Sequence, residues 1–172
     1  MDPVIKLAKQ TIETYLKTNQ IPPLPEKLPS ELLKKRAGVF VSIHKKDGSL
    51  RGCIGTFLPT KPNLALEIIT NAISSATQDP RFPPITKEEL PSLIYSVDVL
   101  SEPKRANKKQ LNPQKHGLIV ATKDGRRGLL LPALPNVKTV EHQIEICKMK
   151  AGIGPKEEVE FQTFTVKRHE EK

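Results

Sequence analysis

The strongest constraint on the fold is an Asp-Gly pair between two runs of alternating apolar and polar residues. The first run covers Val39 to His44, Lys46-Asp47-Gly48 follows, and the second run covers Leu50 to Phe57. Asp-Gly between such runs is typical of a two-residue type I′ hairpin turn, in which both central residues adopt positive φ. The sequence therefore predicts a β-hairpin that turns at Asp47-Gly48.

Counting outward from a two-residue turn predicts the register of this hairpin. His44 then faces Arg51, Ser42 faces Cys53, and Val41 faces Ile54. Directly paired residues share a face of the sheet, so one face holds Val39, Val41, Ile43, Gly52, Ile54 and Thr56, and the other holds Phe40, Ser42, His44, Arg51, Cys53 and Gly55. The first face is predicted to be buried, and Gly52 and Gly55 are predicted to clear space beside the Cys53 thiol.

Helical patterns occur on both sides of this hairpin. Asp2-Pro3 favours a helix start, and apolar residues then recur at helical spacing over 3–18. A second helix is predicted from Asn63, and Thr86 with Glu89 forms a capping box for a short helix that runs through Leu93. Together with the hairpin, these patterns predict an α+β fold.

The second half of the chain continues with extended and helical segments. Residues 93–100 and 159–166 alternate as strands, whereas the polar and basic residues 101–115 are predicted to form a surface loop. The segment TVEHQIEICKMKA is predicted to be helical and places Cys147 on an apolar stripe. Cys147 is therefore predicted to lie in the core.

The segment HGLIVATKDGRRGLLLP resembles the first hairpin and also precedes a helix. It suggests a weak internal repeat of hairpin and helix, and a chance likeness is the alternative. Aligning Arg127-Gly128 with Arg51-Gly52 puts Leu129 at the position of Cys53. Only the first copy could therefore carry thiol chemistry.

The net charge of +9 favours polyanions, acidic partners or phosphorylated ligands. The basic clusters are dispersed, and aromatic residues make up only 4% of the chain, so they form no base-stacking platform. No specific nucleic-acid binding is predicted.

The patterns of cysteine, histidine and apolar residues limit which other classes of protein the chain can belong to. The two cysteines have no CxxC spacing and no secretory leader precedes them, which favours free thiols and a cytoplasmic location. No run is long and apolar enough to suggest a membrane span. The four histidines show no metal-ligand spacing and no nucleotide-binding motif occurs, so no metal and no cofactor are predicted.

The motifs LRGCIGTF, DPRFPPIT and HGLIV occur in this order along the chain. In this the chain resembles the AMMECR family, named for the chromosomal region of Alport syndrome, intellectual disability, midface hypoplasia and elliptocytosis. The likeness covers nearly the whole chain and implies one AMMECR-like domain over residues 1–172, with mixed sheets in two interlocked subdomains. It also implies an unassigned biochemistry, with Memo-type and radical-SAM proteins as candidate partners.

The family motifs fall on Arg51 to Gly55, on Arg81 and Phe82, and on His116 and Gly117. Cys53 is a candidate nucleophile, because Arg51 and His44 on its face would favour a thiolate and lower its pKa. The alternative is a small buried thiol that only packs. His116 is a candidate acid or base, or it simply ends a loop.

Arg51 and Arg81 are candidate ligands for a small carboxylate or phosphate, with Ser42 and His44 beside them. Alternatively, Arg81 bridges Asp79 and orders its loop. Two functions remain open: an enzyme or enzyme subunit acting on a small anionic metabolite in a cleft around Cys53, and a non-catalytic binding or adapter module.

Overall fold

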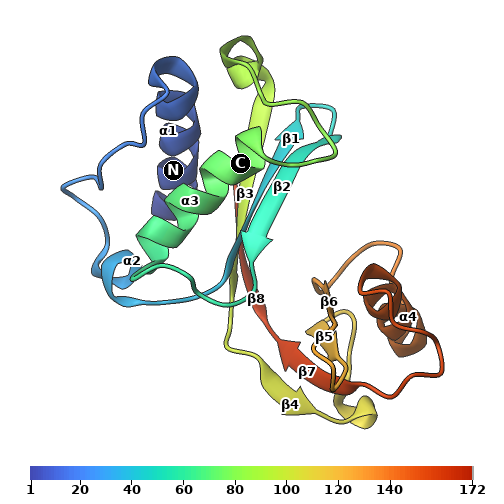
Figure 1. Cartoon of the computed structure of the whole chain (residues 1–172). Helices are drawn as coiled ribbons and strands as arrows, with labels where there is room; N and C mark the ends of the chain where they lie inside the picture. Colours follow the sequence, from blue (N-terminus) through green and yellow to red (C-terminus); the bar gives the residue numbers. More distant parts are fainter. Residues whose placement is uncertain (172) are drawn as a thin grey trace. The chain divides into compact units, whose positions relative to one another are not determined.

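The computed structural model describes residues 1–171 and divides the chain into two compact units. Unit 2 holds residues 101–166, and unit 1 holds 1–100 together with the segment that begins at Lys167. Helices and strands occur in both units, which confirms the α+β class (Figure 1). Because the chain leaves unit 1 and later returns to it, the two units are interlocked as predicted.

Unit 1 is built on a four-stranded sheet in the order β2-β1-β3-β8. The strands are β1 (Val39–Lys45), β2 (Leu50–Thr56), β3 (Leu93–Leu100) and β8 (Val166–Glu170). Both β2 and β3 pair antiparallel with β1. The sheets of the two units are antiparallel rather than mixed. Short hairpins join β1 to β2 and β5 to β6, a connection that only antiparallel strands allow.

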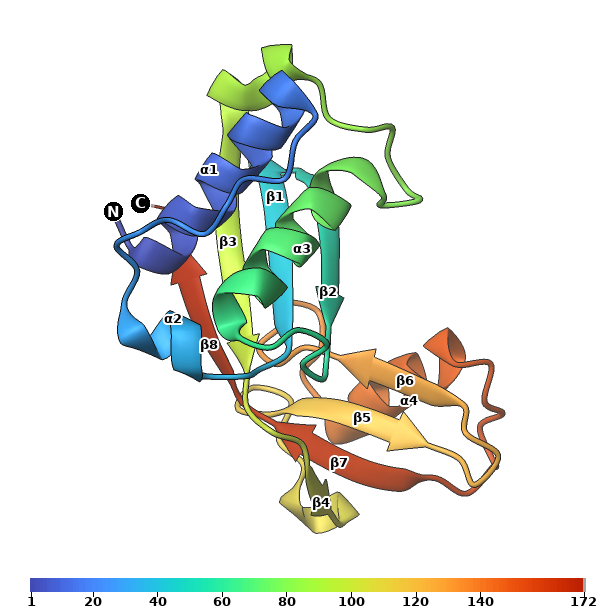
Figure 2. The same cartoon turned by 60° about the vertical axis from the view of Figure 1, so that its left-hand side comes forward.

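Two long helices cover one face of this sheet, as Figures 1 and 2 show. The helices of unit 1 are α1 (Pro3–Thr18), α2 (Ser30–Lys34), α3 (Leu64–Thr77) and the 3₁₀-helix η1 (Lys87–Ser92). Asp2 caps α1, as predicted. Asn63, near which the second helix was predicted to begin, caps α3. Val39, Val41 and Ile43 of β1 are fully buried beneath the helices, so the predicted core face is confirmed. The opposite face carries no helix of unit 1 within residues 1–171.

The β1–β2 loop has three residues rather than two. The Lys45 N–H donates to the Ser49 carbonyl oxygen (2.9 Å), and the Gly48 N–H donates to the Lys45 carbonyl oxygen (2.9 Å). Gly48 alone in the loop takes a positive φ, +85°, which a type I′ turn would also require of Asp47. The predicted two-residue turn was therefore wrong.

A β-bulge at Arg51 cancels the extra loop residue. His44 faces Leu50, whereas Ile43 faces Gly52 and Ser42 faces Cys53. Arg51 is the inserted residue of the bulge and has no partner on β1. The pairing of Ser42 with Cys53 is confirmed, and the pairing of His44 with Arg51 was wrong.

Unit 2 has a second four-stranded sheet, in the order β4-β7-β5-β6, packed against one helix. Its elements are β4 (Lys104–Ala106), η2 (Lys108–Gln110), β5 (Gly117–Ala121), β6 (Arg127–Leu130), α4 (Val140–Lys150) and β7 (Glu160–Phe164). Cys147 on α4 is fully buried with Leu118 and Val120, as predicted. The predicted loop 101–115 contains β4 and η2. The predicted strand 159–166 corresponds to β7, which ends at Phe164, and its last residue, Val166, begins β8 in the sheet of unit 1.

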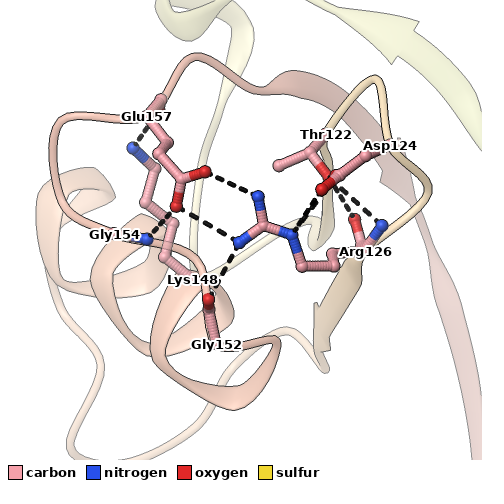
Figure 3. Close-up of polar contacts among 7 residues, drawn as sticks. All are labelled: Thr122, Asp124, Arg126, Lys148, Gly152, Gly154 and Glu157. Carbon is pink, nitrogen blue, oxygen red and sulfur yellow. Dashed lines mark hydrogen bonds and ion pairs between the residues drawn. The ribbon is translucent and has the colours of Figure 1, made fainter.

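Arg126 fastens the β5–β6 turn to the segment that follows α4 (Figure 3). Its guanidinium contacts Asp124 within the turn, and it donates to the Glu157 carboxylate (2.6 Å) and to the Gly152 carbonyl oxygen (3.0 Å). Lys148 of α4 donates to the Glu157 carbonyl oxygen (2.7 Å). This exposed network connects a hairpin turn with a helix end.

The two hairpins are alike in detail. In the second hairpin the Thr122 N–H donates to Arg126 and the Gly125 N–H donates to Thr122, as in the first turn. A Cβ on Gly52 would overlap the Ser75 carbonyl oxygen of α3, and a Cβ on Gly128 would overlap the Cys147 carbonyl oxygen of α4. Each strand thus approaches its helix closely at one glycine. The origin of this likeness by duplication stays a prediction.

Candidate functional site

Polar side chains gather around Cys53 on the sheet face turned away from α1 and α3. Cys53 lies opposite Ser42, which in turn lies opposite Ser96. The Ser42 hydroxyl donates to the Cys53 sulfur (3.1 Å). We call this surface the Cys53 face and define it by Ser42, Cys53, Ser96, Asp98, Arg81 and Arg168.

Asp79, in the loop after α3, holds both the backbone of Cys53 and the side chain of Arg81. Its Oδ2 accepts the Cys53 N–H (2.8 Å), and its two carboxylate oxygens accept Arg81 Nε (3.0 Å) and Nη2 (2.8 Å). The Asp79 side chain is 3% exposed, whereas that of Arg81 is 56% exposed. Arg81 Nη2 also reaches the Cys53 carbonyl oxygen (3.4 Å). The guanidinium is therefore fixed at the surface beside the thiol.

A second pair of the same design lies across the sheet. Arg168 of β8 donates from Nε (2.7 Å) and Nη2 (2.8 Å) to the two carboxylate oxygens of Asp98 on β3. Asp98 is 5% exposed and Arg168 is 42% exposed. The Asp98 carboxylate lies close enough to Cys53 to contribute to raising the pKa of its thiol. The sequence did not single out Asp98 or Arg168, although the alternation of 93–100 already set Asp98 apart from its buried neighbours Val97 and Val99.

Burial raises the pKa of the Cys53 thiol above its ordinary value. The Ser42 hydrogen bond and the Arg81 charge lower this pKa, and the carboxylates of Asp98 and Asp79 raise it. The thiol is therefore protonated at neutral pH. The expected lowering of the pKa was wrong in direction, because burial of the thiol, with smaller contributions from two carboxylates, outweighs the Ser42 hydrogen bond and the Arg81 charge.

Asp79 itself is strongly acidic. The hydrogen bonds from the Arg81 side chain hold the pKa of the Asp79 carboxyl far below its usual range, with further lowering by the backbone N–H groups of Cys53 and Arg81. Asp79 is therefore ionised at neutral pH.

Arg51 is directed into the protein. Its side chain is 8% exposed, and its guanidinium makes two hydrogen bonds to Glu89 (2.7 and 3.0 Å) and one to the Pro83 carbonyl oxygen (2.9 Å). It also lies over the Phe82 ring, 6.0 Å from the ring centroid. Arg51 thus fastens the loop before η1 to β2, whereas Arg81 presents an exposed guanidinium.

The two glycines of the motif make room for the protein itself. The missing side chain of Gly52 accommodates the Ser75 carbonyl oxygen, and that of Gly55 accommodates the Phe40 ring. The expectation that both glycines clear space for a ligand was therefore wrong.

Two further candidates, His44 and His116, lie near the first hairpin turn and in unit 2. His44 lies opposite Leu50 near the hairpin turn. His116 belongs to unit 2, where its carbonyl oxygen accepts Gln143 Nε2 (3.0 Å) and its Nδ1 is buried without a hydrogen-bond partner among residues 1–171. The structure therefore brings Ser42, Cys53 and Arg81 together within unit 1.

Two general features complete the description. Within the described chain, no three His, Cys, Asp or Glu side chains gather closely enough to hold a metal ion. No helix of residues 1–171 combines the length and apolar character needed to cross a membrane.

Fold and site together define a class of two-unit α+β protein. Its first hairpin carries an Arg-Gly-Cys motif at the edge of a four-stranded sheet, beside a fixed arginine. The AMMECR1 family model matches residues 5–169. The chain belongs to the AMMECR1 family, which confirms the resemblance seen in the motifs.

Relatives of known sequence or structure extend this result. A protein of Thermotoga maritima is 53% identical over 169 residues, which cover 97% of each chain. A protein of Clostridium acetobutylicum is 46% identical over 99% of this chain, which spans only 36% of that longer protein. The crystal structure of an uncharacterised protein from Pyrococcus horikoshii superposes with a TM-score of 0.87 at 34% identity, covering 98% of this chain and 89% of that one.

Proposed function

We propose that the chain binds a small anionic molecule, a carboxylate or a phosphate, on the Cys53 face. The observation that carries this proposal is the pair of arginines held by buried aspartates. Both Arg81 and Arg168 use Nε and Nη2 for their aspartate, and within residues 1–171 neither Nη1 makes a hydrogen bond. Two fixed guanidinium groups with free donors are suited to bind an oxyanion.

The groups between the arginines favour binding over nucleophilic chemistry. A protonated thiol is a weak nucleophile, and no histidine contacts Cys53 among the described residues. Ser96 adds a hydroxyl group that can donate to a ligand, whereas the Ser42 hydroxyl already donates to the Cys53 sulfur. The chain has two free cysteines, consistent with the proposed cytoplasmic location.

Each aspartate cancels the charge of its arginine, so recognition depends on donor geometry more than on net attraction. Ordered donors lose little conformational freedom on binding, which favours affinity for a ligand of matching shape. A dicarboxylate that reaches both arginines is therefore expected to bind more tightly than a monocarboxylate.

Protection of the Cys53 thiol tests the proposal. Iodoacetamide labelling, followed by peptide mapping, is measured with phosphate, acetate or succinate present. Bound anion should slow the labelling of Cys53 and leave Cys147 unchanged. Arg81→Gln and Arg168→Gln should each weaken protection about tenfold, whereas Arg105→Gln, an exposed arginine of unit 2, should leave it unchanged.

Equal protection in all three variants would contradict the proposed site. Failure of all three anions to protect Cys53 at millimolar concentration would also contradict it.

An adapter role is the second candidate, and one comparison favours it. In the Clostridium relative the matching region is joined to a much longer remainder of the same chain, which suggests that this domain works beside another protein module. The Cys53→Ser variant distinguishes an adapter from an enzyme that uses the thiol, because the substitution nearly preserves the side-chain volume and removes the thiol. An adapter should keep its partner in that variant, while an enzyme using Cys53 should lose turnover.

A further inference from the structure

A hollow on the surface of unit 1, apart from the Cys53 face, is lined in part by lysines. It lies among α1, η1 and the β1–β2 turn and has a volume of about 540 Å³. This lies within the range of about 300 to 1,000 Å³ that small-molecule sites occupy. None of its lining residues belongs to the Cys53 face, so the two surfaces are distinct and this inference does not rest on the proposed function.

Four lysines line the hollow, and three of them have no ion-pair partner within residues 1–171. Lys9 is paired with Glu171 (2.6 Å) and lies over the Tyr95 ring, 5.8 Å from its centroid. Lys17, Lys46 and Lys87 are exposed and come from three different elements. Repulsion among like charges disfavours such convergence, and an anion would relieve it.

The backbone at each of these three lysines is fixed by local structure. Lys17 stands in the last turn of α1, which ends where the Asn19 N–H donates to the Tyr15 carbonyl oxygen (2.7 Å). The Lys46 N–H donates to the Ser92 carbonyl oxygen (3.1 Å), which ties the hairpin turn to the end of η1. Lys87 opens η1 directly after the Thr86 capping box. The ammonium groups therefore extend from ordered elements.

Four of the residues that line the hollow are apolar. Leu90, Pro91, Leu93 and Ile94 line it on the side of η1 and β3. Of the two carboxylates at the rim, Glu171 is neutralised by Lys9, and Glu13 lies one helical turn before Lys17. Among residues 1–171, the four lysines and two glutamates that line the hollow leave an excess of two positive charges.

We propose that this hollow binds an anionic small molecule with an apolar body, such as an organic phosphate. Its charged end contacts Lys17, Lys46 and Lys87, and its apolar part packs on Leu90 and Ile94. Neither half of the site is sufficient: the lysines alone would bind inorganic anions weakly in water, and the apolar lining alone is small.

Three probes separate the contributions: phenyl phosphate, inorganic phosphate and benzyl alcohol. Binding is followed by amide chemical shifts of the full chain. Phenyl phosphate should shift amides at Lys17, Lys46 and Ile94, and inorganic phosphate and benzyl alcohol should bind at least tenfold more weakly. Raising the salt concentration should weaken the binding of phenyl phosphate, because its charged contacts are near the surface.

Lysine variants complete the test. Lys17→Gln, Lys46→Gln and Lys87→Gln should each weaken phenyl phosphate binding about fivefold, while Lys27→Gln, an exposed lysine outside the hollow, should not. These substitutions are on the surface, and the amide spectrum reports whether each variant is folded. The proposal is overturned if phenyl phosphate does not bind at millimolar concentration, if the shifts fall on Ser42 and Cys53 instead, or if the lysine variants bind like Lys27→Gln.

Discussion

At the scale of single residues, Asp79 determines the geometry of the Cys53 face. One nearly buried carboxylate accepts the Cys53 N–H from the edge strand β2 and two donors from Arg81. The first bond uses the Cys53 N–H, a donor on the edge strand that could otherwise pair with a strand of another molecule. The other bonds hold the exposed Arg81 guanidinium in place. Asp79 therefore links the edge strand to the position of a candidate anion-binding group.

Asp79 should make the free energy of unfolding of the protein fall at acidic pH. Its folded pKa lies far below the ordinary value near 4, so its contribution is complete above about pH 4 and is lost as the pH falls further. Asp79→Asn should be less stable than the native protein at pH 7, and the difference should narrow toward pH 2. Urea unfolding between pH 7 and pH 2 measures both curves.

Glu26→Gln, which removes an exposed carboxylate far from these contacts in the sequence, is the control and should follow the native curve. A constant difference between Asp79→Asn and the native protein at all pH values would show that the loss comes from packing rather than from ionisation.

How much of this site could be predicted depends on the sequence separation of its residues. Ser42 and Cys53 are joined by one hairpin, so counting from the turn brought them together. The bridge from Arg81 to Asp79 spans two residues and was already weighed as an alternative. Arg168 and Asp98 are 70 residues apart on strands that pair only in the folded sheet, and no local pattern connects them.

At the scale of elements, the first hairpin shows how a correct register can follow from an incorrect turn. The three-residue loop shifts the pairing by one position, and the bulge at Arg51 shifts it back. Burial of Val41 and Ile43 on the helix side decides the register of the strand centre. The apolar pattern therefore predicted the faces, whereas loop length and bulge depend on contacts made by Arg51 that the pattern does not contain.

Those contacts should make Arg51 sensitive even to conservative substitution. Lysine cannot reproduce the two-bond contact with Glu89 and the bond to the Pro83 carbonyl oxygen together. Arg51→Lys should reduce the free energy of unfolding by about 1 to 3 kcal/mol, measured by urea denaturation. It should also raise amide exchange at residues 82–89.

Arg36→Lys provides the comparison, since Arg36 is exposed and, within the described part of the chain, donates only to the Lys61 carbonyl oxygen. Equal stability of the Arg51 and Arg36 variants would mean that the bulge is held by packing against α3 alone.

At the scale of the whole chain, the central question is whether the two units unfold together. The resemblance to the AMMECR family implies one domain over residues 1–172, and the contacts divide the chain into two units. The two strands that cross between units are joined where they pass, because Ser101 and Thr165 exchange hydrogen bonds of 2.9 Å. Beyond that crossing, β8 completes the sheet of unit 1 and supplies Arg168 to Asp98.

We expect a single cooperative transition, because unfolding of unit 2 would release the Ser101–Thr165 crossing and with it the anchor of β8. The chain carries its own reporters, since Cys53 lies in unit 1 and Cys147 lies in unit 2. Brief thiol labelling along a urea gradient, with each peptide quantified by mass, should give coincident midpoints for the two cysteines.

A pair of matched glycine variants makes this expectation decisive. A methyl group at Gly52 meets the Ser75 carbonyl oxygen in unit 1, and a methyl group at Gly128 meets the Cys147 carbonyl oxygen in unit 2. Gly52→Ala and Gly128→Ala should each cost about 1 to 3 kcal/mol through this overlap. In one cooperative domain each variant lowers the labelling midpoints of both cysteines equally. If Gly128→Ala shifts only Cys147 and Gly52→Ala shifts only Cys53, the units unfold independently, and β8 then stays in the sheet of unit 1 without help from the crossing.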